Sequence, residues 1–238
     1  MSSEFKEAVS LFKKGQLKKA EKICENILKN EPKNYNNLNL LGIILFQKKN
    51  YNEAIRLIKK SIQISPNQSE ANNNLGIIYI HLKKFKEAIF HLNNSIKVNP
   101  NFDQSYNNLG LAFMELKEFD KALQNWKKAI SVNPNNAQAY NNIGNVLMEI
   151  NNEKSAIKHY QKAILINENF ILAHFNLGNA FQKVNLLDES INSYNKAIEL
   201  NIKFAEAYYN RANSYRDKNS LKKALNDYNE AYKLNPAL

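Results

Sequence analysis

The sequence predicts an all-α protein made of seven helical hairpins in a row. Two features carry this prediction: residues of the same type recur every 34 positions, and apolar residues within each period recur three or four apart. All five prolines fall at one place in their periods, as do five of the six glycines. The recurring positions are Gly42, Gly76, Gly110, Gly144 and Gly178, and Pro32, Pro66, Pro100, Pro134 and Pro236.

The segment 103–136 shows the unit most clearly. Tyr106, Leu109 and Phe113 lie on one face of a first helix, and Ala122 and Trp126 lie on one face of a second, because residues three or four apart share a helical face. We expect helices over 103–116 and 120–132, with Asp120 capping the second. Proline then ends five of the seven hairpins, because it lacks an N–H and its ring clashes with the preceding turn.

This pattern resembles the tetratricopeptide repeat, in which an aromatic residue, Leu-Gly, a second aromatic residue, Ala, a third aromatic residue and Pro follow at fixed spacing. The resemblance covers the whole chain and implies a right-handed superhelical solenoid. It also implies a single array with no linker, in which each repeat contacts only its neighbours. The expected repeats are 1–34, 35–68, 69–102, 103–136, 137–170, 171–204 and 205–238.

The two ends and the later repeats depart from the pattern. Glu4 and Glu7 give the first helix a polar outer side, as a capping repeat needs. The last hairpin instead has an apolar second helix with no polar helix after it, which predicts either a continuation of the array or self-association. Departures inside the array are Glu153 in a turn, Ser190 for alanine, Arg211-Ala212 for Leu-Gly, and Glu168 and Ile202 for proline.

Composition places the chain in a reducing, cytoplasmic setting. Its single cysteine, Cys24, shares a register with Trp126, so we expect a small core residue rather than a nucleophile or half of a disulfide. The amino terminus is interrupted by charge and carries repeat pattern, unlike a targeting peptide. No apolar run is long enough to span a bilayer.

The sequence offers no chemistry typical of an enzyme. The glycines occur singly inside helices, so there is no glycine-rich phosphate loop. The four histidines, His81, His91, His159 and His174, are not beside Cys, Asp or Glu at ligand spacing, and His174 is expected in or near the core. We therefore expect no catalytic residue, no metal and no cofactor.

The net charge of +11 raises the possibility of nucleic-acid binding. Side chains expected on the inner wall are nearly balanced, however: Lys6, Lys13, Lys183 and Arg216 against Glu70, Glu115, Glu149, Glu206 and Asp217. The excess lysines fall in turns and second helices, where such runs are usually solvated. Binding of nucleic acid or ribonucleoprotein through this basic outer surface stays an alternative.

The sharpest functional signal is a row of asparagines, here called the ladder, two residues before each glycine register. Its members are Asn74, Asn108, Asn142, Asn176 and Asn210. The row is similar to the asparagine ladder of the repeat domain of protein O-linked N-acetylglucosamine transferases. An amide has both a donor and an acceptor, so it can pair with a peptide group. The competing explanation is an asparagine-rich chain, with 41 asparagines in 238 residues.

A second row lies one residue after the glycine register, and it changes character along the chain. It holds Val9, Ile43, Ile77 and Leu111 in the first four repeats, then Asn145, Asn179 and Asn213. An apolar part followed by a polar part suits peptide recognition. The apolar part is equally suited to contact between successive first helices.

These observations favour a scaffold that binds a protein or peptide, with an extended polypeptide held along a concave surface. It would act alone or as the substrate-docking module of a larger enzyme. The alternatives are nucleic-acid binding and a structural array that assembles through the last helix.

Overall fold

The computed structural model describes residues 2–238; Met1 of the first repeat lies outside them. These residues form fourteen α-helices and no strand. They pair as seven hairpins, as the 34-residue period predicted. The helices are α1 Ser3–Lys13, α2 Leu17–Asn30, α3 Tyr35–Gln47, α4 Tyr51–Ile64, α5 Ser69–His81, α6 Phe85–Val98, α7 Asp103–Glu115, α8 Phe119–Val132, α9 Ala137–Glu149, α10 Glu153–Ile166, α11 Ile171–Lys183, α12 Leu187–Leu200, α13 Ala205–Asp217 and α14 Leu221–Leu234.

One expected helix start was wrong by one residue. α8 begins at Phe119, and the carbonyl oxygen of Glu118 accepts the N–H of Ala122 at 3.0 Å. Glu118 is therefore the capping residue, and Asp120 lies in the first turn. The Asp120 carboxylate therefore lies near the positive, N-terminal end of the α8 dipole.

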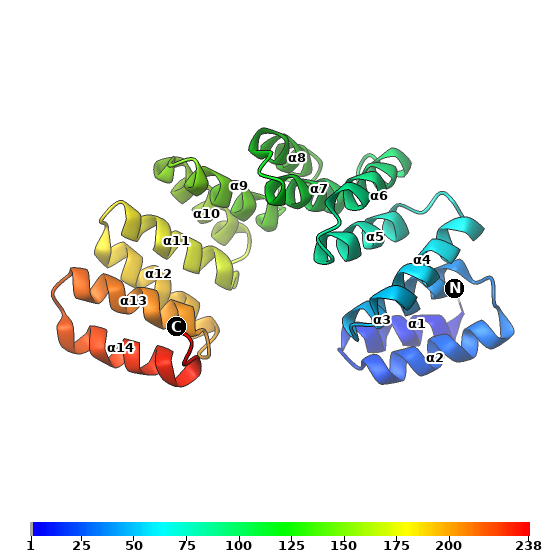
Figure 1. The fold of residues 1–238 in the computed structure, drawn as a ribbon, viewed down its shortest axis with the longest axis horizontal. Helices are drawn as coiled ribbons and strands as arrows, with labels where there is room; N and C mark the ends of the chain where they lie inside the picture. Colours follow the sequence, from blue (N-terminus) through cyan, green and yellow to red (C-terminus); the bar gives the residue numbers. More distant parts are fainter. Residues whose placement is uncertain (1) are drawn as a thin grey trace. The chain divides into compact units, whose positions relative to one another are not determined.

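The chain forms two compact units, unit 1 (Met1–Val132) and unit 2 (Asn133–Leu238). Unit 1 holds α1–α8 and unit 2 holds α9–α14 (Figure 1). Within each unit, the second helix of a hairpin packs against its own first helix and against the first helix of the next hairpin. Burial is therefore shared between neighbouring repeats, as in a repeat array.

Each hairpin turns through one residue with a left-handed backbone. In unit 1 these residues are Gly15, with φ of 71°, and Lys49, Lys83 and Lys117; in unit 2 they are Asn151, Asn185 and Asn219. Glycine and asparagine adopt this conformation readily, whereas a lysine pays a steric cost at its Cβ. The three lysine turns of unit 1 are therefore strained.

The recurring glycine packs against the large side chain of the second helix. A Cβ on Gly110 would lie 2.5 Å from Nε1 of Trp126, and one on Gly178 would lie 2.5 Å from the ring of Tyr194. Trp126 and Tyr194 are fully buried. The absence of a side chain is what lets the two helices of a hairpin approach so closely.

The ends agree with the sequence pattern. Glu4 and Glu7 of α1 are exposed. On α14, Leu221, Leu225 and Tyr232 are 60–63% exposed, although Tyr228 and Leu234 of the same helix are half-buried. In the preceding repeat, the positions that correspond to Leu225 and Tyr232 are Ile191 and Ile198 of α12. Both isoleucines are buried, and α13 packs against α12.

Two departures from the repeat pattern have polar partners in unit 2. The Arg211 guanidinium forms an ion pair with Asp227, with Nε 2.7 Å from Oδ2 and Nη2 2.8 Å from Oδ1. The hydroxyl of Ser190 lies 3.0 Å from that of Ser214 in the core. In each case a polar residue that replaces an apolar one is matched by a second polar residue on a packed helix.

Candidate functional site: the first-helix walls

The candidate site lies on the first helices of the hairpins. In unit 1, α1, α3, α5 and α7 contact one another in succession; in unit 2, α9, α11 and α13 do the same. We call each of these surfaces a first-helix wall. Both asparagine rows predicted from the sequence lie on these helices.

Ladder amides are hydrogen-bonded to the preceding repeat. In unit 1, Nδ2 of Asn74 donates to Oδ1 of Asn39 at 3.0 Å, and Nδ2 of Asn108 donates to Oδ1 of Asn73 at 2.9 Å. Asn74 and Asn108 are half-buried. Each amide uses one N–H within the protein, so the ladder also joins successive repeats.

In unit 2 the acceptor changes with the local sequence. Nδ2 of Asn176 donates to Oδ1 of both Asn141 and Asn145, at 3.0 Å each. One repeat later, the position that corresponds to Asn141 holds Phe175, which has no side-chain amide. Nδ2 of Asn210 donates instead to Oδ1 of Asn179 at 2.9 Å. Asn176 and Asn210 are half-buried.

The remaining ladder residue, Asn142, is 6% exposed, which makes it the most buried of the ladder. The other four keep part of their surface in solvent. The ladder is thus neither sealed between repeats nor freely solvated. Its expected role in ligand contact stays a prediction.

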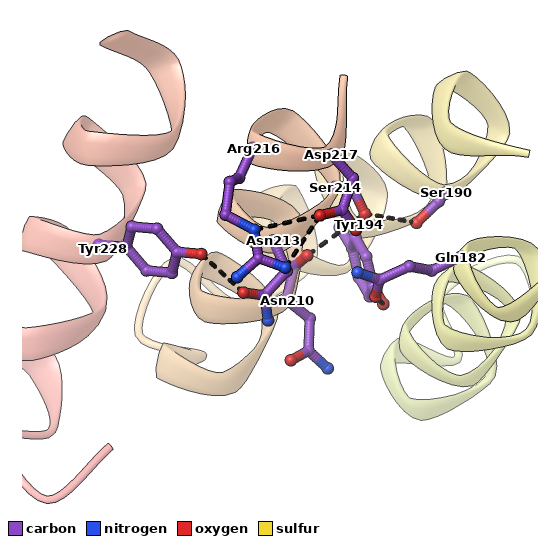
Figure 2. Close-up of polar contacts among 9 residues, drawn as sticks. All are labelled: Gln182, Ser190, Tyr194, Asn210, Asn213, Ser214, Arg216, Asp217 and Tyr228. Carbon is purple, nitrogen blue, oxygen red and sulfur yellow. Dashed lines mark hydrogen bonds and ion pairs between the residues drawn. The ribbon is translucent and has the colours of Figure 1, made fainter. Parts of the chain in front are cut away.

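The second row is bonded to tyrosines of the second helices. The Tyr160 hydroxyl donates to Oδ1 of Asn145 at 2.9 Å, and Tyr194 donates to Oδ1 of Asn179 at 2.6 Å. Tyr228 reaches Asn213 from α14 in the same way, at 2.6 Å (Figure 2). All three asparagines are half-buried.

Sequence reasoning missed these tyrosine partners, although a signal was present. Asparagine on the first helix and tyrosine fifteen residues later occur together in the last three repeats. The first four repeats hold apolar pairs at the same registers, such as Ile43 with Ile58 and Leu111 with Trp126. The change from apolar to polar along the second row is therefore a coordinated change of both helices.

Unit 1 carries a hollow in its first-helix wall, with a volume of about 390 Å³. Its apolar lining comes from α1 and α3 and includes Phe5, Phe12 and Ile43. Asn39 and the ladder residue Asn74 also line it, so the amide pair borders an apolar space. Further lining residues are Val9, Lys13, Asn36, Leu40 and Glu70.

Two of the cations on the wall of unit 2 are neutralised. Nζ of Lys183 lies 2.9 Å from a carboxylate oxygen of Glu153, the residue that departs from the repeat pattern near the turn. Arg216 is paired with the neighbouring Asp217 at 2.9 Å (Figure 2). Lys183 lowers the pKa of the Glu153 carboxyl group through a hydrogen bond.

Cys24 and His174 lie in the core. Cys24 is fully buried, and burial raises the pKa of its thiol to about 12. His174 is buried as expected, with Nε2 2.8 Å from the carbonyl oxygen of Glu168. Residues 2–238 contain no group of three or more His, Cys, Asp or Glu side chains placed to hold a metal ion. Within the same residues, no helix is long and apolar enough to cross a membrane.

Comparison with known families finds matching models over most of the chain. A model described as anaphase-promoting complex, cyclosome, subunit 3, matches residues 13–95. A TPR repeat model matches residues 111–151, 144–185 and 185–215, and a tetratricopeptide repeat model matches residues 205–238. The two repeat models together span more than half of the chain. No curated protein sequence matches.

Solved structures share the fold at low sequence identity. A chain in the crystal structure of the APC/C hetero-tetramer Cut9–Hcn1 is 21% identical with a TM-score of 0.84; the match covers 96% of this chain but 45% of that one. PilF of Pseudomonas aeruginosa is 16% identical with a TM-score of 0.76, covering 86% of this chain and 93% of its own. YrrB, described as a TPR protein with an unusual peptide-binding site, is 21% identical with a TM-score of 0.59, covering 75% and 92%.

Proposed function

Because this chain belongs to the tetratricopeptide repeat family, we propose that it is a protein-binding scaffold whose first-helix walls hold an extended polypeptide. One observation carries the proposal: the first helices bring partly exposed asparagine amides to one surface in both units. A backbone amide pairs with a side-chain amide in both directions, so such a surface can bind a polypeptide with little dependence on its sequence.

The internal hydrogen bonds leave capacity for a ligand. Asn74 and Asn108 each donate one N–H to the preceding repeat, and an amide has a second N–H and a carbonyl oxygen with two lone pairs. The internal bond also fixes the side chain, so less rotamer entropy is lost on binding. The ladder thus supports both the stacking of the repeats and the contact with a ligand.

Unit 1 adds a place for an apolar side chain. The hollow lined by Phe5, Phe12 and Ile43 is bordered by the Asn39–Asn74 pair, so a bulky side chain could enter it while its own backbone reaches the amides. Recognition of this kind combines an apolar anchor with backbone contacts. We propose binding and not catalysis, because amides and apolar side chains supply no nucleophile or general base.

The test measures binding of a fluorescent, capped peptide of alternating Ser, Val and Thr to the whole chain. The double variant Asn108→Ala, Asn176→Ala should bind about thirtyfold more weakly, since each of the two lost hydrogen bonds is worth about 1 kcal/mol. The matched control is Asn192→Ala, which removes an exposed asparagine from the second helix α12. Equal affinity of the double variant and the control would remove the ladder from the proposal.

A salt titration separates peptide binding from the alternative. Peptide binding by neutral amides should change little with ionic strength, whereas binding of an oligonucleotide by lysines falls steeply with salt. If the peptide fails to bind while a single-stranded oligonucleotide binds with a steep salt dependence, the outer basic surface is the site and the proposal is wrong.

A further inference from the structure

We propose that the wall of unit 2 is a row of fixed amide donors that bind the carbonyl oxygens of a peptide in the polyproline II conformation. The donors are the Nδ2 groups of Asn145, Asn179 and Asn213, and the tyrosines bonded to them are positioning residues. This inference rests on the proposed function and specifies its ligand.

The carbonyl ends of these amides are occupied within the protein. Oδ1 of Asn179 accepts from the Tyr194 hydroxyl at 2.6 Å and from Nδ2 of Asn210 at 2.9 Å. Oδ1 of Asn145 accepts from Tyr160 at 2.9 Å and from Nδ2 of Asn176 at 3.0 Å. A carbonyl oxygen has two lone pairs, so both are used.

The donor ends point the other way. An amide can present either end to its surroundings, but a contact of 2.6 Å is typical of O–H···O and shorter than an ordinary N–H···O bond. The short distances from Tyr194 to Asn179 and from Tyr228 to Asn213 therefore fix Oδ1 toward the tyrosine. Within residues 2–238, Nδ2 of Asn145, Asn179 and Asn213 donates to no protein acceptor.

Tyr160 and Tyr194 remain donors over the physiological pH range. Burial raises the pKa of Tyr160 and of Tyr194, so the neutral hydroxyl persists. Figure 2 shows that Tyr228 approaches Asn213 of α13 from α14. The second helices thus set the direction of the amides on the first helices.

Uncharged donors select a neutral acceptor. Lys183 and Arg216 are paired with Glu153 and Asp217, so they offer little charge to a carboxylate or phosphate. A backbone carbonyl oxygen is the neutral acceptor that every polypeptide carries. The row therefore fits the carbonyl face of a peptide better than an anionic ligand.

Spacing favours polyproline II over a β-strand. Helices that pack side by side lie about 8–10 Å apart, and α9, α11 and α13 contact one another in this order. A polyproline II helix presents the same face every three residues, which is about 9 Å. A strand repeats each face after about 6.7 Å. A wall that only donates needs no N–H from its ligand, so proline residues are compatible with it.

The experiment uses a capped oligoproline, which has carbonyl groups but no backbone N–H, with the whole chain and fluorescence anisotropy. The inference predicts saturable binding that weakens about tenfold or more in Asn145→Asp, Asn179→Asp, because an ionised carboxylate can only accept. Asn192→Asp on α12 is exposed and is the control for added charge.

Tyr160→Phe, Tyr194→Phe tests the positioning role. Leu92 holds the same register in the third repeat, so an apolar side chain fits there. We expect binding about fivefold weaker with unchanged helical circular dichroism at the assay temperature. Tyr232→Phe, on the exposed face of α14, should have no effect. In the natural chain, the Nδ2 proton signals of Asn179 should also shift on addition of oligoproline. If Tyr194 had only a structural role and did not orient Asn179 toward the ligand, these signals would not shift.

The outcomes separate the two proposals. If the Ser-Val-Thr peptide binds through the ladder but oligoproline does not, the donor row is wrong and the proposed function stands. Oligoproline binding that the Asn→Asp or Tyr→Phe variants leave unchanged also overturns the inference. If neither peptide binds, both proposals fail.

Discussion

The ion pair between Arg211 and Asp227 provides the sharpest test of how this array is stabilised. Arg211 stands in α13 where Leu41 stands in the second repeat, and Asp227 stands in α14 where Leu57 stands. The paired side chains are only 16% and 11% exposed. The same two registers therefore hold an apolar contact in one repeat and a buried ion pair in another.

Breaking the pair should destabilise the last hairpin strongly. Removing one partner of a buried pair costs about 3–5 kcal/mol, because the other charge is left without compensation. Both side chains keep some exposure, so we expect the lower end, about 3 kcal/mol, for Asp227→Ala. Arg211 also lies 5.3 Å from the ring of Tyr208, and Arg211→Leu should lose this contact as well.

Replacing both residues should restore stability. The double variant Arg211→Leu, Asp227→Leu reproduces the buried Leu41–Leu57 pair of the second repeat. Substitution of buried ion pairs by packed apolar residues is often neutral or stabilising by about 1–4 kcal/mol. We therefore expect the double variant to be at least as stable as the natural chain.

Hydrogen exchange is the suitable assay, since stability in a repeat array is local. In Asp227→Ala, amides of α13 and α14 should exchange about 100-fold faster, while those of α3 and α4 stay unchanged. The double variant should regain the protection. If Asp227→Ala leaves exchange unchanged, or if the Leu–Leu variant is as damaged as either single variant, the reasoning about this pair is wrong.

Three further predictions concern the hairpin itself. Gly178→Ala places a Cβ 2.5 Å from the Tyr194 ring; overpacking of about 1–3 kcal/mol should outweigh a propensity gain of about 1 kcal/mol, and an unchanged thermal midpoint would contradict this. Lys117→Gly relieves a φ of 59° and should stabilise by about 0.5–1 kcal/mol in urea titration, whereas Lys127→Gly within α8 should destabilise by about 1 kcal/mol; the reverse order would be inconsistent with strain at the turn. The thiol of Cys24, with its pKa raised to about 12 by burial, should react with iodoacetamide only as the chain unfolds, and rapid labelling without denaturant would disprove its burial.

The sequence alone was sufficient to predict the hairpins because their contacts are local. Gly110 and Trp126 lie on the two helices of one hairpin, which a short connection joins. The same contact recurs at the corresponding positions from Gly42 to Gly178. Period, proline position and apolar stripe all depend on interactions within one unit or between adjacent units. These features determined the helix count, and the bounds expected for α7 and α8 were met to within one residue: α7 ends at Glu115 instead of 116, and α8 begins at Phe119 instead of 120.

The polar contacts of the walls could not be predicted in the same way. Whether Asn210 bonds to the residue 35 or 31 positions earlier depends on Phe175 occupying the first of these registers. The bond from Tyr194 to Asn179 requires the side chains to meet across the hairpin. Single registers do not specify such geometry, although the joint appearance of asparagine and tyrosine in the last three repeats does indicate it.

Side-chain NMR during a peptide titration shows whether the wall amides contact the ligand. With selective labelling of asparagine, we expect the Nδ2 proton signals of Asn108, Asn145, Asn176 and Asn179 to shift in proportion to bound peptide, while that of Asn192 on α12 stays fixed. Saturable binding that moves only Asn192 and other outer-face signals, and leaves the wall amides unchanged, would contradict this expectation.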